Sequence, residues 1–60
     1  MRLRLTLRQG RRSIASEELA DPRFGDVTVA LGRLLAEARK RLDKEPWDCT
    51  IQIRRISDDP

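Results

Sequence analysis

The sequence predicts an α+β domain in which two alternating segments flank one long amphipathic helix. Leucines occupy every second position over residues 3–7, and apolar residues alternate with polar ones again over residues 47–53; this period of two is typical of a strand that buries one face. Between them, from Val27 to Leu42, apolar residues recur every three or four positions, which is the spacing of a helix with one buried side. We expect a single small domain over residues 1–60, in the order strand, short helix, long helix, strand, with two or three strands per chain.

The first segment, RLRLTLR, sorts its residues cleanly between two faces. Its leucines are expected to point into the core, since successive side chains of a strand point to opposite sides. The other face then carries a row of polar residues: Arg2, Arg4, Thr6 and Arg8. This row either binds a ligand or keeps the outer face of the strand hydrated.

Residues 9–15 allow two interpretations, a hairpin or the start of a helix. Gln9 and Gly10 are suitable for a two-residue turn, with Arg12 and Ile14 in a second strand, but such turns prefer Asn or Asp before the glycine. The sequence alone leaves the choice between them open.

The segment SIASEELAD favours a short helix. Ser13 or Ser16 can cap its amino end, and two glutamates follow where the helix dipole favours acids. Asp21 and Pro22 end it after two turns, with Ile14 and Leu19 facing inward.

The long helix is expected to begin with Asp26 as its N-cap and to end before Pro46. Its opposite side is charged. The inward stripe comprises Val27, Leu31, Leu34, Leu35, Ala38 and Leu42.

The last strand is expected to place Trp47, Cys49, Ile51 and Ile53 inward, with Thr50, Gln52 and Arg54 on its outer face. Ile56 falls on the wrong parity, which predicts a bulge or the end of pairing near Arg54 and Arg55. The polar residues 57–60 are expected to fray.

If the two strands are neighbours, a parallel arrangement with a crossover is expected. A two-stranded sheet is not stable alone, and a chain of 60 residues has a thin core. One cysteine and no histidine exclude an internal disulfide and a Cys/His zinc site. We therefore expect a homodimer that joins strand edges across a two-fold axis.

The residue inventory argues against catalysis. Without histidine there is no Ser/His or Cys/His pair and no ordinary general base near neutral pH. The three glycines are scattered and form no phosphate-binding loop. We expect no enzymatic activity, no metal and no cofactor. The lone cysteine and the absence of a signal peptide or an apolar span predict a soluble cytoplasmic protein with no membrane partner.

Charge is the remaining indication of function. The formal net charge is +3, and residues 1–12 contain five arginines and no acid, which favours a polyanionic partner. The lead hypothesis is a regulatory protein that binds nucleic acid, in particular duplex DNA; the alternative is a protein interaction or assembly module. Arg33 and Lys40 are further candidates for phosphate contacts. The candidate nucleic-acid-binding residues are Arg2, Arg4, Thr6, Arg8, Arg11, Arg12, Gln52 and Arg54.

Over residues 2–44, LTLR and the Leu19-Ala20 pair ahead of Gly25 resemble the ribbon-helix-helix family of dimeric DNA-binding proteins. The resemblance implies that Arg4, Thr6 and Arg8 enter a major groove. The chain departs from that pattern at Pro22, in the Gly25 loop, and in its last strand. DPRFGDVTV, at residues 21–29, is similar to a segment of ribosome-binding factor A, but its neighbours do not match and it implies no function here.

Overall fold

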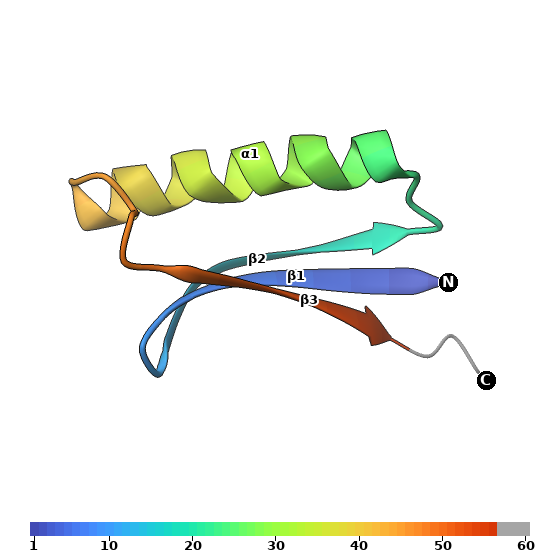
Figure 1. Cartoon of the computed structure of the whole chain (residues 1–60), viewed down its shortest axis with the longest axis horizontal. Helices are drawn as coiled ribbons and strands as arrows, with labels where there is room; N and C mark the ends of the chain where they lie inside the picture. The colour runs from blue at the N-terminus through green and yellow to red at the C-terminus, as the bar shows by residue number, and fades with distance from the viewer. Residues whose placement is uncertain (57–60) are drawn as a thin grey trace.

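A computed structural model of the chain describes residues 1–56 as one three-stranded sheet with one helix on it (Figure 1). The expected tail at residues 57–60 lies outside the described residues. The elements are β1 (Arg2–Gln9), β2 (Arg12–Ala20), α1 (Phe24–Leu42) and β3 (Thr50–Ile56). The small α+β fold is therefore confirmed, but it holds three strands and one helix where the sequence predicted a second, shorter helix.

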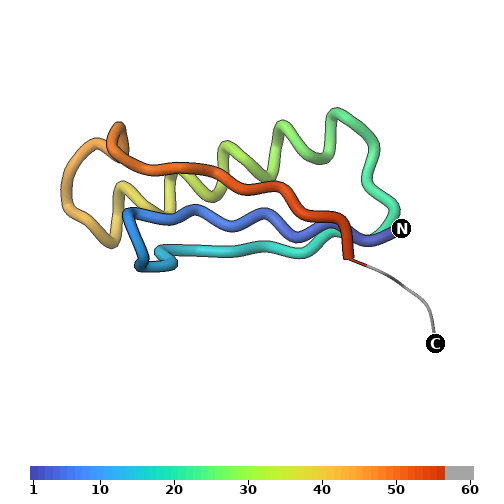
Figure 2. The backbone as a smooth tube through the Cα atoms, turned by 60° about the horizontal axis from the view of Figure 1, so that its bottom comes forward, coloured from blue at the N-terminus to red at the C-terminus, as the bar shows by residue number. Residues whose placement is uncertain are grey.

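The strands lie in the order β2-β1-β3, and both pairings are antiparallel. Figure 2 shows β1 between its two neighbours along its length. The expected parallel pairing of the first and last strands is wrong. The reason is the additional strand: β2 reverses the chain before the helix, so α1 connects β2 to β3, and these two strands run in the same direction on either side of β1.

The core lies between α1 and the leucine face of β1. Leu5 and Leu7 are fully buried. They belong to two adjoining apolar clusters with Ala30, Leu34 and Ala38 of α1. Alanines on the inner side of the helix let its backbone approach the sheet closely. The predicted inward stripe is largely confirmed, with Ala30 as a buried position that the sequence reading omitted.

Residues 12–20 form a strand, so the predicted short helix is wrong. Their true period is two: Ala15, Glu17 and Leu19 lie opposite leucines of β1 and face the helix side. Glu17 makes this alternation difficult to recognise, because a charged residue occupies a position where an apolar one is expected. Pairing along the whole of β1 outweighs the local helix propensity of the segment.

The β1–β2 turn is a two-residue hairpin loop formed by Gly10 and Arg11, since Gln9 pairs with Arg12. Gly10 has φ of +63°, and Arg11 is not among the residues of positive φ. Glycine at the first central position is the requirement of a type II′ turn. The turn residues are therefore Gly10 and Arg11 and not the predicted Gln9 and Gly10, and the preference for Asn or Asp before glycine belongs to a type I′ turn.

A β-bulge at Ile14 explains the remaining irregularity of β2. Leu7 pairs with Ala15 and Arg8 with Ser13, so Ile14 is the additional residue. Its side chain is buried, and its carbonyl oxygen accepts a hydrogen bond from Nη1 of Arg41 on the helix. The bulge thus adds an apolar side chain to the core, and α1 holds it in place.

The N-cap lies three residues before the predicted one. Arg23 is the N-cap, and Asp26 sits in the first turn, where its carboxylate accepts a 2.9 Å hydrogen bond from the backbone N–H of Arg23. From its position in the first turn, the Asp26 carboxylate therefore satisfies the backbone N–H of the N-cap residue. The carboxyl end closes at Asp43, which adopts a left-handed conformation with φ of 55°.

The last strand differs from its prediction at both ends. It begins at Thr50, and Trp47 lies before it in a turn with 75% of its surface exposed, so the expected inward position of Trp47 is wrong. Cys49 and Ile51 do pack against the core. The bulge expected near Arg54 and Arg55 is also absent from the described strand pairing, which continues in register to Ile56 opposite Arg2.

Candidate nucleic-acid interface

One face of the sheet is left uncovered by the helix. The helix packs on the side of Leu5 and Leu7, and within residues 1–56 no other element lies on the opposite side (Figure 1). Because residues directly opposite each other in a sheet point to the same side, the strand register fixes which side chains share this surface. We call it the open face.

The open face consists of four rows that each cross the sheet from β2 through β1 to β3. Each row contains one residue of the alternating polar set of β1 and its two partners. The rows are Ala20, Arg2 and Ile56; Glu18, Arg4 and Arg54; Ser16, Thr6 and Gln52; and Ser13, Arg8 and Thr50. The register thus brings six of the eight predicted residues together on one surface, and Arg11 and Arg12 lie at the adjoining hairpin.

The row centred on Arg4 contains the face's only acid among the described strands. Arg4 donates from Nη2 to Oε2 of Glu18 at 2.9 Å and from Nε to the same oxygen at 3.2 Å. Both side chains stay about half exposed, so this ion pair contributes little to stability. Four arginines against one glutamate leave the open face positively charged.

At the hairpin end, Arg8 is bound to the turn. Its Nη2 donates to the carbonyl oxygen of Arg11 at 3.2 Å, and its Nε is buried without a partner among the described residues. Arg11 and Arg12 are exposed and extend the positive charge beyond the strand ends.

Arg54 and Gln52 are the least constrained polar groups of the open face. Both are exposed, and neither forms an ion pair or a side-chain hydrogen bond with any part of the chain that the structure describes. The guanidinium of Arg54 and the amide of Gln52 therefore keep all their hydrogen-bonding capacity for a ligand.

The helix surface differs in that its charges pair with one another. Arg41 contacts Glu37 at 3.1 Å, and Arg39 contacts Glu45 at 3.2 Å. Lys40 is exposed beside them. The phosphate contacts expected from Lys40 and Arg33 would lie on the other side of the sheet from the open face.

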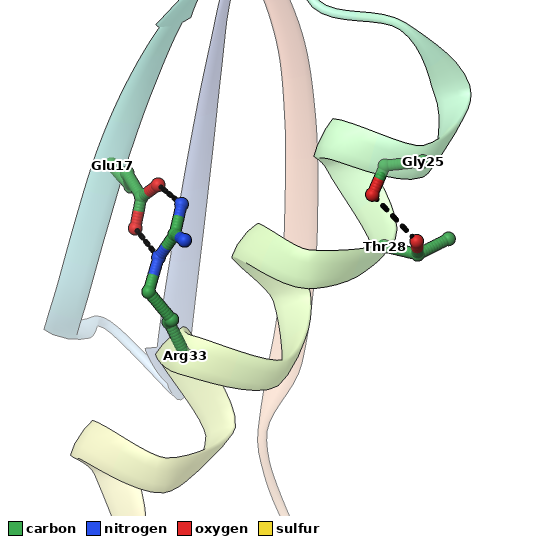
Figure 3. Close-up of polar contacts among 4 residues, drawn as sticks. All are labelled: Glu17, Gly25, Thr28 and Arg33. Carbon is green, nitrogen blue, oxygen red and sulfur yellow. Dashed lines mark hydrogen bonds and ion pairs between the residues drawn. The ribbon is translucent and has the colours of Figure 1, made fainter.

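Arg33 has a structural partner of its own. It donates two hydrogen bonds to the carboxylate of Glu17 on β2, one of them from Nε at 3.1 Å (Figure 3). This hydrogen bonding, with the charge of Arg33 as a smaller contribution, lowers the pKa of Glu17 below its ordinary value of 4.5. The same contact raises the pKa of Arg33. The pair connects helix to sheet and neutralises the one acid that faces the core side in the described strands.

The sequence reading missed the β2 residues of the open face: Ser13, Ser16 and Glu18. The sequence predicts a helix over these positions, although Ser16, Glu18 and Ala20 alternate with Ala15, Glu17 and Leu19. That alternation, which continues up to Asp21, is the feature of the sequence that indicates a strand here. The resemblance to ribbon-helix-helix proteins is likewise not supported, because its first helix falls where the structure has β2.

Across residues 1–56 there is no group of three or more His, Cys, Asp or Glu side chains placed to hold a metal ion. The helix α1 is too polar to span a membrane.

No protein-family model, curated protein or solved structure matches this chain.

Proposed function

We propose that this protein is a small regulatory homodimer that binds nucleic acid, and duplex DNA in particular, through the open face. The observation that carries the proposal is the β1–β3 register, which sets Arg4 beside Arg54 and Thr6 beside Gln52 on a surface without a helix. The role is binding and not catalysis, and the site of action is the cytoplasm.

The chemistry of the open face suits a duplex. Arginine binds phosphates and the edge of guanine through two hydrogen bonds, and glutamine and threonine can contact base edges. The row of Thr6, with its hydroxyl and amide groups, lies between the rows of Arg4 and Arg8. Positive charge for the DNA backbone and hydrogen-bonding groups for the bases therefore occur together.

Aromatic residues argue for a duplex over a single strand. The chain contains one Phe and one Trp and no Tyr. Phe24 begins the helix and Trp47 lies in the turn before β3, so neither belongs to the rows of the open face. Proteins that bind single strands stack bases on aromatic side chains, which this face lacks.

A protein interaction module is the second candidate function. The Arg4–Glu18 pair gives the open face a mixed-charge patch of the kind that suits a polar interface, and the helix surface is mixed as well. Under this alternative the protein would bind a protein partner and show no salt-dependent affinity for DNA.

Fluorescence anisotropy of a labelled duplex separates the two candidates. If four arginines per protomer each neutralise one phosphate, the dimer neutralises eight, and affinity falls about 10⁴-fold between about 50 and 200 mM salt. Replacing Arg4 and Arg8 together by alanine abolishes binding. Affinity that does not change with salt, or no binding at micromolar protein, contradicts the proposal and favours the protein partner.

A further inference from the structure

The two edges of the sheet differ in how far they are obstructed. The edge at β2 contains the bulge at Ile14, and the side chains of Arg33 and Arg41 reach from the helix to β2. The edge at β3 is regular, since all seven residues of Thr50–Ile56 pair with β1 in unbroken register. Backbone groups on the outer side of β3 are therefore available to another strand.

The helix covers the apolar side of β3 only in part. Among residues 1–56, the backbone of α1 lies close to β1 and β2 but not to β3. Ile53 lies opposite the fully buried Leu5, yet 52% of its surface is exposed. Ile51 is only partly buried, at the margin of the cluster formed by Leu7, Ile14 and Ala38. An additional strand next to β3 would bury both isoleucines.

The charges along this segment identify the strand that fits. Asp48 lies two residues before β3, and Arg54 and Arg55 lie near its end. None of the three forms an ion pair with the described residues. If a second β3 runs antiparallel to the first, the Asp48 end of each copy meets the arginine end of the other. A parallel alignment would set like charges together at both ends.

We propose that two copies of this chain join through their β3 edges, antiparallel about a two-fold axis, to form a six-stranded sheet. A two-fold axis normal to the sheet keeps each residue on the same side in both copies, so Ile51 and Ile53 of the two chains meet on the helix side. The inference specifies the dimer of the proposed function, but it does not depend on nucleic-acid binding.

Such a dimer makes the two open faces continuous. Strands in a sheet lie about 4.8 Å apart, so the two β1 strands are separated by three spacings, or about 14 Å. This is comparable with a major groove about 12 Å wide. The arginines of the two β1 strands face the phosphates that border one groove, and Thr50, Gln52 and Arg54 of the paired β3 strands face the bases between them.

Ile53 and Val29 provide a matched pair for the first test. Val29 is 58% exposed, close to the 52% of Ile53, but it borders a hollow lined by Leu19, Pro22 and Arg33 beside β2. Sedimentation velocity without nucleic acid is expected to show a dimer for the wild type and for Val29→Lys, and a monomer for Ile53→Lys. Circular dichroism checks that each variant is folded. A monomeric wild type, or a folded Ile53→Lys that stays dimeric, overturns the inference.

Charge reversal tests the antiparallel direction. In a dimer of Asp48→Arg, residue 48 of each copy and Arg54 and Arg55 of the other copy are all positive where the two β3 ends meet. In a dimer of the double variant Arg54→Asp with Arg55→Asp, the same three positions are all negative. Each variant alone is expected to be weakened at least ten-fold in self-association. When the two variants are mixed, opposite charges meet again at both ends of the β3–β3 contact, and a heterodimer forms at wild-type affinity. Absence of recovery in the mixture overturns the antiparallel β3 arrangement. Because no nucleic acid is present, either failure leaves the DNA proposal to its own assay.

Discussion

Arg4 of β1 lies directly opposite Arg54 of β3 on the open face. Like charges at opposed positions of a sheet are destabilising. Glu18, on the other neighbour of Arg4, offsets part of the repulsion through its 2.9 Å ion pair. A ligand that carries negative charge would remove the rest, which is why this unfavourable placement supports binding of a polyanion.

Replacing Arg54 by threonine is expected to separate stability from binding. Threonine introduces a β-branched side chain, which suits a strand, and removes the repulsion with Arg4, so the free energy of unfolding of the single chain rises by about 0.2–1 kcal/mol. Duplex DNA affinity falls by about ten-fold, with a shallower salt dependence. Thermal denaturation and fluorescence anisotropy measure the two effects on the same sample.

Lys40→Gln is the control for that substitution, since it removes one exposed positive charge from the helix, away from the open face. Its DNA affinity should stay close to that of the wild type. Equal losses for Arg54→Thr and Lys40→Gln would mean that overall charge, and not the open face, decides binding.

The neighbouring acids Glu17 and Glu18 face opposite sides of β2 and should respond differently to neutralisation. Glu18→Gln removes the acid of the open face and releases Arg4, so duplex affinity rises about three-fold at fixed salt. Glu17→Gln removes the same charge from the helix side and is expected to change affinity less. A tighter complex for Glu17→Gln than for Glu18→Gln would count against the open face as the binding surface.

Acidification should weaken the fold through the Glu17–Arg33 contact. The hydrogen bonds from Arg33 hold the pKa of Glu17 below its ordinary value of 4.5. A carboxylate with a depressed pKa stabilises the folded state fully above the unfolded value. That contribution is lost as the pH falls below 4.5 and through the folded pKa.

Urea denaturation at several pH values measures this loss. The Glu17→Gln variant cannot titrate at that position, so its stability should depend less steeply on pH below 4.5 than that of the wild type. Identical acid dependence in the two proteins would show that the Glu17 contact does not contribute.

The core should depend on Leu5 and not on Trp47. Leu5 is fully buried between the helix and the sheet, whereas Trp47 is 75% exposed. Leu5→Ala is expected to cost about 2–5 kcal/mol, and a domain of this size has roughly 3–5 kcal/mol from a single core. Trp47→Ala should change stability by about 0.5 kcal/mol or less. Circular dichroism during heating distinguishes an unfolded Leu5→Ala chain from a nearly unaffected Trp47→Ala chain.

Much of the candidate surface was predictable from the sequence because β1 alternates without exception. The three leucines require a core side, and this requirement alone assigns Arg4 and Thr6 to the other face. The period of α1 was equally clear, since its apolar stripe continues for four turns. Where a regular period persists over several residues, local sequence and tertiary packing favour the same structure.

The strand β2 was not predictable in the same way, because two tertiary features interrupt its pattern. Glu17 occupies a core-side position only because Arg33 reaches it from the helix, and Ile14 is an additional residue held by Arg41. Neither contact is visible in a stretch of local sequence. The position of Trp47 depended on where β3 begins, which pairing with β1 decides.

Nuclear magnetic resonance of the side-chain amides tests the central claim most directly. The chain contains two glutamines and no asparagine, so a ¹⁵N spectrum carries only two such amide groups. Gln52 lies on the open face beside Thr6, and Gln9 lies at the end of β1 beside the hairpin turn. On titration with duplex DNA, we expect the Gln52 amide to shift together with the Nε signal of Arg54, while the Gln9 amide moves little. Binding that leaves the Gln52 and Arg54 signals unmoved would contradict the open face as the nucleic-acid interface.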